Sequence, residues 1–447
     1  MFDISQAQGI IGVGLSGGVG RRSRPLTLKA AGYLRSKGAV RLLGKRVINW
    51  IIDALKQQGV TTYLMVTKGK ENRYQVKRLI GYGEHLGINV RYSHSRFDKL
   101  DHGSADATIM NLEHFRIEQP AFVFPMDSII DIDLAACVKQ HERTGAIITV
   151  CVTEVPASQV VDTYGVIVAD ETRRVVEFVE KPGPARAVEL QEQTSTDRLL
   201  INAGFYLVDS KALRELGHER EIRKMRETSL DFGRDLLPWL VRQGRPVYVF
   251  PVERVGDLGN IPAYLDTMLR VLRGEFRSAQ ATLGPPTFPE RQVWVEPETL
   301  HAKDPWSGKT LAERMKSGEV HIGPRVRIGK YVQIAAGVTL EECNVDDECE
   351  IYANATIRRS SIGEGSIVGP FAVVEDSVTG VMVEIQSSKG ARTHIEGYTA
   401  VGDEVTIRAG VHLEDHVLVY PRLKIPRGCR ISAHAELTCS DDVMRWL

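Results

Sequence analysis

Glycine and arginine are concentrated in one short segment, residues 17–27, with the sequence GGVGRRSRPLT. This segment directly follows an apolar run, residues 9–15, of the kind that forms a strand. Glycines let backbone N–H groups approach a phosphate closely, and arginines add charge-assisted donors. The segment lacks the Gly-Lys-Ser/Thr ending of a Walker-type loop and the G-x-G-x-x-G spacing of dinucleotide binders. It predicts a phosphate-binding loop of another kind, with a plain turn as the alternative.

Strand and helix patterns alternate through the first 270 residues. β-branched and apolar runs predict strands at 61–66, 121–125 and 147–152, and helical patterns lie at 47–55, 105–115 and 133–143. Such alternation predicts βαβ units and a Rossmann-like α/β domain with a mostly parallel sheet. Ligands bind outside the carboxyl ends of strands in these sheets. The pattern therefore selects two candidate places, Leu15 to Gly20 and Met126-Asp127.

Asp127 follows the predicted strand at 121–125. A carboxylate at a strand end could belong to a ligand site, but an aspartate near a helix start could instead cap that helix. Asp127 lies too early to cap the helix expected from residue 133, so we favour a site role. Asp131 and Asp133 are nearby acidic alternatives.

A six-residue period dominates the last third of the chain. Seven apolar residues lie six apart, namely Ile395, Val401, Ile407, Leu413, Val419, Ile425 and Ile431. The same period runs through Ile322, Ile328, Ile334 and Leu340, and the stretch from Lys389 to Thr393 interrupts it. A sustained hexapeptide period predicts a parallel β-helix, in which six residues form one side of a triangular coil. Its flat faces favour assembly or regulation over catalysis.

Composition excludes several classes of protein. Lys plus Arg equals Asp plus Glu at 57 each, so nothing marks a nucleic-acid or anionic-membrane surface. No apolar run is long enough to cross a bilayer, and the N-terminus lacks the basic region of a signal peptide. The six cysteines include no C-x-x-C pair, which argues against zinc and against a disulfide framework. We expect a cytoplasmic protein with no nucleic-acid or membrane partner.

Several motifs in order along the chain resemble the sugar-1-phosphate nucleotidyltransferases, also called NDP-sugar pyrophosphorylases. The loop at 17–27 resembles the family's G-G-x-G-T-R-L-x-P-L-T, and Gly44-Lys45 follows Lys37 at the family's spacing. Further matches are HGSADA at 102–107, YGVI at 164–167, VVEFVEKP at 175–182, INAGFY at 201–206, SLDFGRD at 229–235 and GDLGN at 256–260. The HGSADA, SLDFGRD and GDLGN segments are most similar to the ADP-glucose pyrophosphorylase branch.

The nucleotide loop departs from the family pattern. Arg21 replaces the usual threonine and Ser23 the usual leucine, both prolines beside Lys37 are missing, and about five extra residues precede Lys37. These changes leave the identity of the base and the sugar open.

The resemblance implies a reaction and a set of site residues. A nucleoside triphosphate and a sugar- or cyclitol-1-phosphate would give a nucleotide sugar and pyrophosphate, with Mg²⁺ held by Asp127 and Asp257. Arg22, Lys37 and Asp127 would be catalytic. Nucleotide contacts would come from Leu15, Gly17, Gly18, Gly20, Arg22, Gly103 and Asp106. Sugar-phosphate contacts would come from Gly165, Glu180, Lys181, Asn202 and Asp235.

The resemblance also implies the domain order. We expect a catalytic domain at 1–275, a linker at 276–318 with a short helix near 310–316, and a left-handed β-helix at 319–447. A homo-oligomer, dimer or tetramer, is expected.

Four functions stay open at this point. ATP and glucose 1-phosphate are the best-supported substrates. A guanylyltransferase acting on mannose 1-phosphate, or on a cyclitol phosphate such as valienol 1-phosphate, is the first alternative, and the Val419-Tyr420-Pro421 segment resembles aromatic–proline turns of mannose-type relatives. A catalytically weak regulatory subunit that binds sugar nucleotide is the second. An acyltransferase is the third, because hexapeptide coils also host acetyl transfer, with His394, His412 or His416 as candidate residues.

Overall fold

A computed structural model describes residue 4 and residues 8–18, 20–30, 32–305 and 307–446. The chain forms two compact units, Met1–Gly18 with Ile51–Val255, and Val19–Trp50 with Gly256–Leu447. Helix α1 (Val47–Gln57) and strand β13 (Arg254–Asp257) each include residues of both units. The domain boundaries expected from the sequence stay a prediction.

The first unit is built on a nine-stranded sheet. Its strands are β1 (Ile11–Ser16), β4 (Thr62–Thr67), β5 (Asn89–Tyr92), β6 (Ala121–Pro125), β8 (Ile148–Pro156), β9 (Gly165–Ala169), β10 (Val175–Glu180), β11 (Arg198–Val208) and β12 (Val247–Pro251). A short strand, β7 (Ser128–Asp131), follows β6. The helices are α2 (Lys70–Ile80), α3 (Ser104–His114), α4 (Leu134–Thr144), α5 (Pro184–Thr194), α6 (Ser210–Leu216), α7 (Arg220–Arg226) and α8 (Leu237–Arg242).

The Rossmann-like α/β class is confirmed, and the sheet is mixed. Strands pair in parallel across β5, β4, β1 and β6, which is the part that the βαβ pattern describes. The long strand β11 then pairs antiparallel with β6, β8 and β9. An antiparallel neighbour needs no crossover helix, so the helix–strand alternation could not reveal the antiparallel pairing of β11 with these strands.

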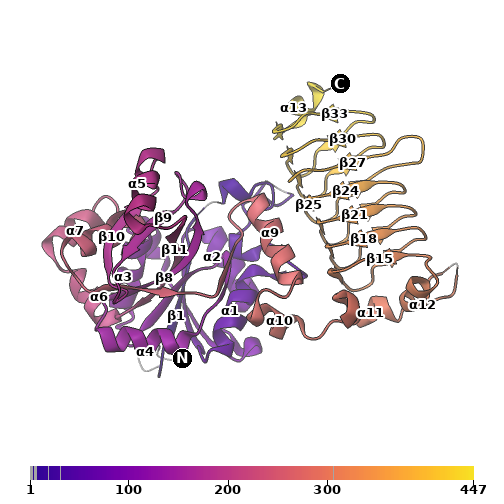
Figure 1. The fold of residues 1–447 in the computed structure, drawn as a ribbon. Coiled ribbons are helices and arrows are strands. Elements are labelled where there is room, and N and C mark those ends of the chain that lie inside the picture. The colour runs from indigo at the N-terminus through magenta and orange to yellow at the C-terminus, as the bar shows by residue number, and fades with distance from the viewer. Residues whose placement is uncertain (1–3, 5–7, 19, 31, 306, 447) are drawn as a thin grey trace. The chain divides into compact units, whose positions relative to one another are not determined.

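The second unit carries the predicted β-helix, whose coils run from orange to yellow in Figure 1. Three parallel sheets form its sides. One contains β14 (Val293–Val295), β16 (Val326–Ile328), β19 (Asn344–Val345), β22 (Ser361–Ile362), β25 (Val378–Thr379), β28 (Ala400–Val401), β31 (Leu418–Val419) and β34 (Glu436–Leu437). The next contains β15 (His321–Ile322), β18 (Thr339–Glu341), β21 (Thr356–Arg358), β24 (Val373–Glu375), β27 (His394–Ile395), β30 (His412–Leu413) and β33 (Arg430–Ile431). The last contains β17 (Gln333–Ile334), β20 (Glu350–Ile351), β23 (Ile367–Val368), β26 (Glu384–Ile385), β29 (Thr406–Ile407) and β32 (Lys424–Ile425).

Strand pairing explains the hexapeptide period. His412 pairs with Arg430, eighteen residues on, so three six-residue sides make one coil. The interruption expected at 389–393 lies between β26 and β27, where a Ser388–Ala391 bridge closes a bulge and the pairing offset rises to the twenty-two residues between Glu384 and Thr406. This arrangement is consistent with the expected left-handed β-helix.

The remaining elements of the second unit precede the coils or close them. They are β2 (Arg41–Leu42), β3 (Lys45–Arg46), α9 (Ile261–Leu272), α10 (Arg277–Leu283), α11 (Pro297–Leu300), α12 (Leu311–Lys316) and α13 (Ser440–Met444). The short helix expected near 310–316 is α12, and Thr310 and Glu313 form its capping box. Within this unit, the Tyr264 hydroxyl of α9 donates to the Arg41 carbonyl oxygen at 2.8 Å.

No helix among the described residues has both the length and the apolar character needed to span a bilayer.

The inward residues of the coils should dominate the stability of the β-helix. Ile407 is fully buried, so Ile407→Ala removes apolar contacts and leaves a cavity. We expect its unfolding free energy to fall by about 2–5 kcal/mol, measured by urea unfolding. Ile367 makes a matched control because it is 37% exposed on β23. Ile367→Ala should cost about 1 kcal/mol or less, and equal losses in the two variants would contradict the assigned core.

Candidate active site

The strand order marks the ends of β1 and β6 as the place where a ligand is expected. The chain adds β4 and β5 on one side of β1 and β6 on the other, so the winding direction reverses between β1 and β6. Leu15 pairs with Pro125 at this edge, and the Met126 backbone N–H donates to the Leu15 carbonyl oxygen at 3.1 Å. The structure therefore brings Leu15, just before the glycine loop, beside the turn that contains Met126 and Asp127.

Asp127 lies in the turn between β6 and β7 and is half-buried. It does not cap the following helix, because Asp133 does. The Asp133 side chain accepts a hydrogen bond from the Ala136 backbone N–H at 2.9 Å at the start of α4. Asp127 therefore does not cap α4, and its role in a ligand site stays a prediction.

The HGSADA segment packs directly on the SLDFGRD segment. A Cβ atom at Gly103 would lie 2.5 Å from the Leu230 carbonyl oxygen, so only glycine permits this approach. That oxygen accepts hydrogen bonds from the backbone N–H groups of Ala105 and Asp106, both at 3.1 Å. The Leu230 N–H donates in return to the His102 carbonyl oxygen at 3.0 Å. Two motifs that lie far apart in the sequence thus form one local structure.

Side chains extend this contact. The Ser104 hydroxyl donates to Asp231 Oδ1 at 2.7 Å and accepts from the Phe232 N–H at 3.1 Å. Asp235 Oδ2 accepts from the Asp231 N–H and from the Ser229 hydroxyl, both at 2.8 Å. Asp235 therefore fixes the start of the π-helical turn at Phe232–Leu236. Its hydrogen bonds indicate a positioning role for this predicted sugar-contact residue.

Asp106 is almost completely buried, at 1% exposure. Its Oδ1 accepts from Arg226 Nε at 2.6 Å and its Oδ2 from the His102 N–H at 3.0 Å. Arg226 also contacts Glu113 at 3.2 Å. A buried carboxylate paired in this way holds its surroundings in place, because removal of either partner would leave a charge without compensation. Asp106 thus supports the predicted nucleotide pocket by shaping the 102–106 loop.

Glu180, Gly165 and Asn202 form a second group of predicted residues. Glu180 at the end of β10 pairs with Gly165 on β9. A Cβ atom added at Gly165 would lie 2.7 Å from Glu180 Oε2, and one added at Gly233 would lie 3.0 Å from it. The carboxylate therefore packs closely against both glycines. Asn202 donates to the Tyr206 hydroxyl at 2.8 Å, and the Tyr206 ring stacks on Phe232 with centroids 4.4 Å apart. The structure brings these three predicted sugar contacts together.

Burial raises the pKa of Glu180, and the Asp231 carboxylate raises it further, whereas Lys181 and Arg234 act in the opposite direction. Glu180 and Asp231 therefore interact electrostatically, which links the second group to the HGSADA contact. A carboxylate held in this way is suited to accept hydrogen bonds from hydroxyl groups.

Lys181 follows β10 in the left-handed conformation, with φ 46°, and is exposed. Its N–H donates to the Tyr164 carbonyl oxygen at 3.1 Å, and Pro182 follows. The backbone thus turns sharply just after Glu180 and presents Lys181 to solvent.

The rest of the predicted phosphate loop lies in the second unit. Gly20 has φ 62°, and a Cβ atom there would lie 2.8 Å from the Thr27 side chain. The Thr27 hydroxyl donates to the Gly20 carbonyl oxygen at 2.7 Å and closes the loop. The match of Gly20 and Thr27 to the family motif therefore has a structural reason.

Arg22 and Asp257 are carried by segments that contact each other. The buried Ser23 hydroxyl donates to the Leu258 carbonyl oxygen at 3.2 Å. Asp257 is exposed, and its Oδ1 accepts from the Gly259 N–H at 2.8 Å, which orients the carboxylate. Arg22 is exposed, and half-buried Lys37 begins the short helix at Lys37–Ala39. The structure brings the loop of Arg22 beside the segment of Asp257.

Sequence reasoning missed three polar residues of the site, namely Ser104, Arg226 and Asp231. Ser104 lies in the HGSADA motif and Asp231 in the SLDFGRD motif, so their place in these motifs could have identified them as candidate site residues. Arg226 lies in no motif, and its contact with Asp106 spans 120 residues. No local pattern in the sequence could have revealed that contact.

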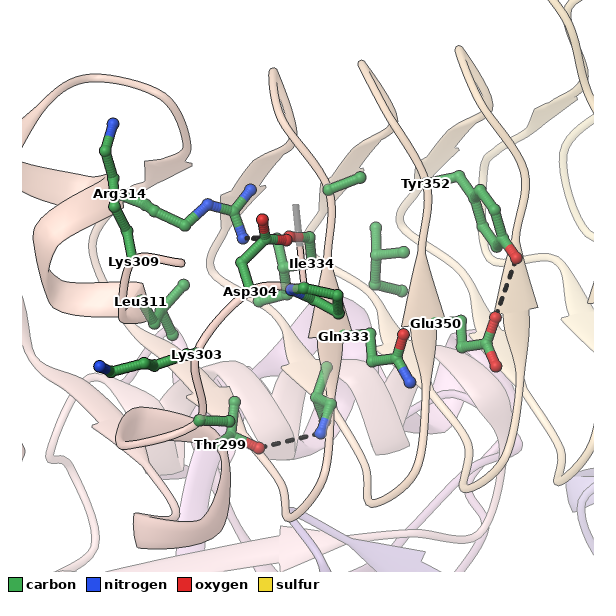
Figure 2. A pocket seen from close by; sticks show the side chains of 15 residues that line it. Thr299, Lys303, Asp304, Lys309, Leu311, Arg314, Gln333, Ile334, Glu350 and Tyr352 are labelled. Carbon is green, nitrogen blue, oxygen red and sulfur yellow. Dashed lines mark hydrogen bonds and ion pairs between the residues drawn. The ribbon is translucent and has the colours of Figure 1, made fainter. Parts of the chain in front are cut away.

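A cavity of about 120 Å³ lies elsewhere, between residues 299–314 and the first coils of the β-helix. Figure 2 shows Arg314 beside Asp304 and Glu350 beside Tyr352. Arg314 Nε donates to Glu319 at 2.6 Å, and Glu350 accepts from the Tyr352 hydroxyl at 3.0 Å. This cavity contains none of the predicted site residues.

Comparison with known proteins shows which families the chain is similar to. Residues 11–274 match the family model described as nucleotidyl transferase, and residues 316–390 match the GMPPB C-terminal domain. A UTP–glucose-1-phosphate uridylyltransferase of Synechocystis sp. is 26% identical over 84% of this chain and 90% of its own length. A glucose-1-phosphate adenylyltransferase of Alteromonas mediterranea is 26% identical over 84% of this chain and 89% of its own length. A glucose-1-phosphate adenylyltransferase of Thermus thermophilus is 28% identical over 59% of this chain and 67% of its own length.

The first family model covers more than half of the chain, including both motif pairs that the structure joins. The chain therefore belongs to the nucleotidyl transferase family and is a sugar-1-phosphate nucleotidyltransferase.

Proposed function

We propose that the chain transfers an adenylyl group from ATP to glucose 1-phosphate, giving ADP-glucose and pyrophosphate. The observation that carries the proposal is the direct contact of HGSADA with SLDFGRD through Gly103 and Leu230. Both segments are most similar to the ADP-glucose pyrophosphorylase branch. Relatives named glucose-1-phosphate adenylyltransferase support the same choice.

The reaction needs positioning and charge neutralisation more than proton transfer. A phosphate oxygen of glucose 1-phosphate attacks the α-phosphorus of ATP, and the bond from that phosphorus to the bridging oxygen breaks as pyrophosphate leaves. Backbone N–H groups at Gly17, Gly18 and Gly20 would contact the triphosphate, with Arg22 and Lys37 supplying positive charge. Leu15 and Gly103 would line the nucleotide pocket.

The acceptor would bind at the second group of residues. Glu180 would accept hydrogen bonds from sugar hydroxyls above Gly165, beside Asn202. Lys181 is exposed next to this carboxylate and would bind the sugar phosphate. Asp106 and Asp235 would hold the surrounding loops through the contacts described above.

Asp127 and Asp257 would hold Mg²⁺. Both offer carboxylate oxygens, the ligands that Mg²⁺ prefers, and both are partly or fully accessible. The Gly259 N–H already orients the Asp257 carboxylate. When bound, the ion would neutralise negative charge on the phosphates.

A guanylyltransferase acting on mannose 1-phosphate or on a cyclitol phosphate is the second candidate. The Val419-Tyr420-Pro421 segment favours it, and in the structure the Tyr420 hydroxyl donates to Glu436 at 2.6 Å. The departures at Arg21 and Ser23 also fall beside the predicted nucleotide site.

A substrate panel tests the proposal. Pyrophosphate release with Mg²⁺ should be measured for five nucleoside triphosphates against glucose, mannose and cyclitol phosphates. The highest kcat/KM is expected for ATP with glucose 1-phosphate. Preference for GTP with mannose 1-phosphate or a cyclitol phosphate would contradict adenylyl transfer and favour the guanylyltransferase. No turnover with any pair would favour a regulatory subunit.

Asp127→Asn should lower kcat by at least about a hundredfold, because it removes a charge from the predicted Mg²⁺ ligands while keeping the shape of the side chain. Steady-state pyrophosphate release measures the effect. Asp133→Asn is the matched control, since asparagine also caps helices well and Asp133 serves α4. Normal turnover in Asp127→Asn would remove Asp127 from the metal site.

Glu180→Gln should raise the KM for the sugar phosphate by about tenfold or more and also change the pH dependence of stability. Because the folded-state pKa of Glu180 is raised, native Glu180 favours folding below its ordinary pKa of about 4.3 and loses that contribution as pH rises through the folded-state pKa. As pH rises from the ordinary pKa of glutamate through the raised folded-state pKa of Glu180, the unfolding free energy of Glu180→Gln should therefore increase relative to that of the native chain.

Thermal unfolding between about pH 4 and pH 8 measures this gain. The exposed Glu192 on α5 supplies the control variant, Glu192→Gln, for which we expect neither effect. A stability difference between Glu180→Gln and native chain that does not change with pH would contradict the assigned burial of Glu180.

A further inference from the structure

One corner of the β-helix carries a column of aromatic and imidazole side chains. Tyr398, His416 and His434 occupy the same corner of successive coils, each in the left-handed conformation with φ 59°, 57° and 63°. The Tyr398 and His416 rings have centroids 5.3 Å apart, and the His416 and His434 rings 5.0 Å apart. Coil stacking alone therefore aligns two imidazoles in adjacent coils.

Backbone hydrogen bonds fix this corner. The His416 N–H donates to the Gly397 carbonyl oxygen at 2.5 Å, and the His434 N–H donates to the Asp415 carbonyl oxygen at 2.8 Å. The parallel strands β28, β31 and β34 continue on one side of the corner. The side chains thus project from a backbone that is already ordered, which lowers the entropic cost of binding a ligand.

Asp415 completes a set of three ligand groups. Ligand atoms of Asp415, His416 and His434 all lie within 4.8 Å of one another. His416 Nδ1 lies 2.8 Å from Asp415 Oδ1, but the contact lacks hydrogen-bond geometry, and Nδ1 is buried with no hydrogen-bond partner in the described part of the chain. A buried imidazole nitrogen that lacks a hydrogen bond needs an explanation, and a metal ion supplies one.

We propose that Asp415, His416 and His434 bind a late first-row divalent transition metal ion, with Zn²⁺ as the reference ion. Zn–N and Zn–O bonds of about 2.0–2.1 Å place two ligands of one tetrahedral ion about 3.4 Å apart. Asp415 and His416 are already within that spacing. His434 is exposed, so a change of side-chain rotamer can bring its ring nitrogen the remaining distance, and solvent supplies the fourth ligand.

This site is chemically distinct from the proposed Mg²⁺ site. Imidazole nitrogens suit Zn²⁺, Cu²⁺, Ni²⁺ and Co²⁺, whereas Mg²⁺ takes oxygen ligands. The ion would join two coils near the end of the β-helix and stabilise them. The cysteine spacing argues against a zinc site built from cysteines. The site proposed here contains no cysteine, so that argument does not apply to it.

The same β-helix offers a matched control group. His394 and His412 also stack in adjacent coils, with ring centroids 5.7 Å apart. There, however, His412 Nε2 already contacts Glu396 at 2.8 Å with hydrogen-bond geometry. This nitrogen of His412 already has a partner, and we expect no metal site at this pair.

Cobalt titration of the full-length chain without a histidine tag tests the proposal. Co²⁺ should bind at one equivalent per chain with a Kd in the micromolar range or tighter, give visible absorption bands, and be displaced by Zn²⁺ but not by Mg²⁺. Zn²⁺ should also raise the melting temperature. Both readouts are independent of nucleotidyl transfer.

His434→Asn and His416→Asn should each weaken Co²⁺ binding by more than about tenfold and remove the Zn²⁺-dependent rise in melting temperature. Asparagine tolerates the left-handed conformation, so these variants should fold. The control His412→Asn, and Cys439→Ser at the one exposed thiol, should bind Co²⁺ as the native chain does. Absent binding, equal affinity in His434→Asn, or an equal loss in His412→Asn would overturn the proposal.

Discussion

The candidate active site depends on the close approach of the backbone at Gly103 to the carbonyl oxygen of Leu230. A single Cβ atom at Gly103 would lie 2.5 Å from that oxygen, so the missing side chain permits the contact. Once the two segments meet, Ser104 reaches Asp231 at 2.7 Å and the start of α3 is fixed against the π-helical turn. Asp231 then raises the pKa of Glu180, so one backbone contact connects both groups of predicted residues.

A second constraint of the same kind acts at the sheet edge. The winding direction reverses between β1 and β6, and Met126 donates to Leu15 there. Gly14 in β1 lies under Met65 and Met126, where a Cβ atom would approach their side chains to 2.8 and 3.0 Å. Because Gly14 has no side chain, the bulky residues of neighbouring strands can pack closely against β1. The polar residues that follow these strands then lie at one edge of the sheet.

The periodic parts of this chain could be predicted from its sequence, and the pairings between distant segments could not. A period of six predicts the coil because every sixth residue from Ile395 to Ile431 is buried in the same kind of local environment, one on each side of the coil. A β-branched run likewise predicts β4, and an apolar run predicts β6. By contrast, β11 joins the sheet antiparallel and Arg226 reaches Asp106 across 120 residues. Such pairings depend on tertiary packing, which local composition does not encode. Motif resemblance located Gly103 and Asp235 but gave no physical reason for them.

The environment of Glu180 shows a conflict between stability and binding. Burial disfavours its charged form, and the Asp231 carboxylate adds to that penalty. Replacing Gly165 or Gly233 by a larger residue would displace the carboxylate, since each glycine leaves space that Glu180 Oε2 occupies. A fold selected for stability alone has no reason to place a carboxylate here. A ligand hydroxyl that donates to this oxygen would offset part of the penalty, which is consistent with the proposed binding of a sugar phosphate beside Glu180.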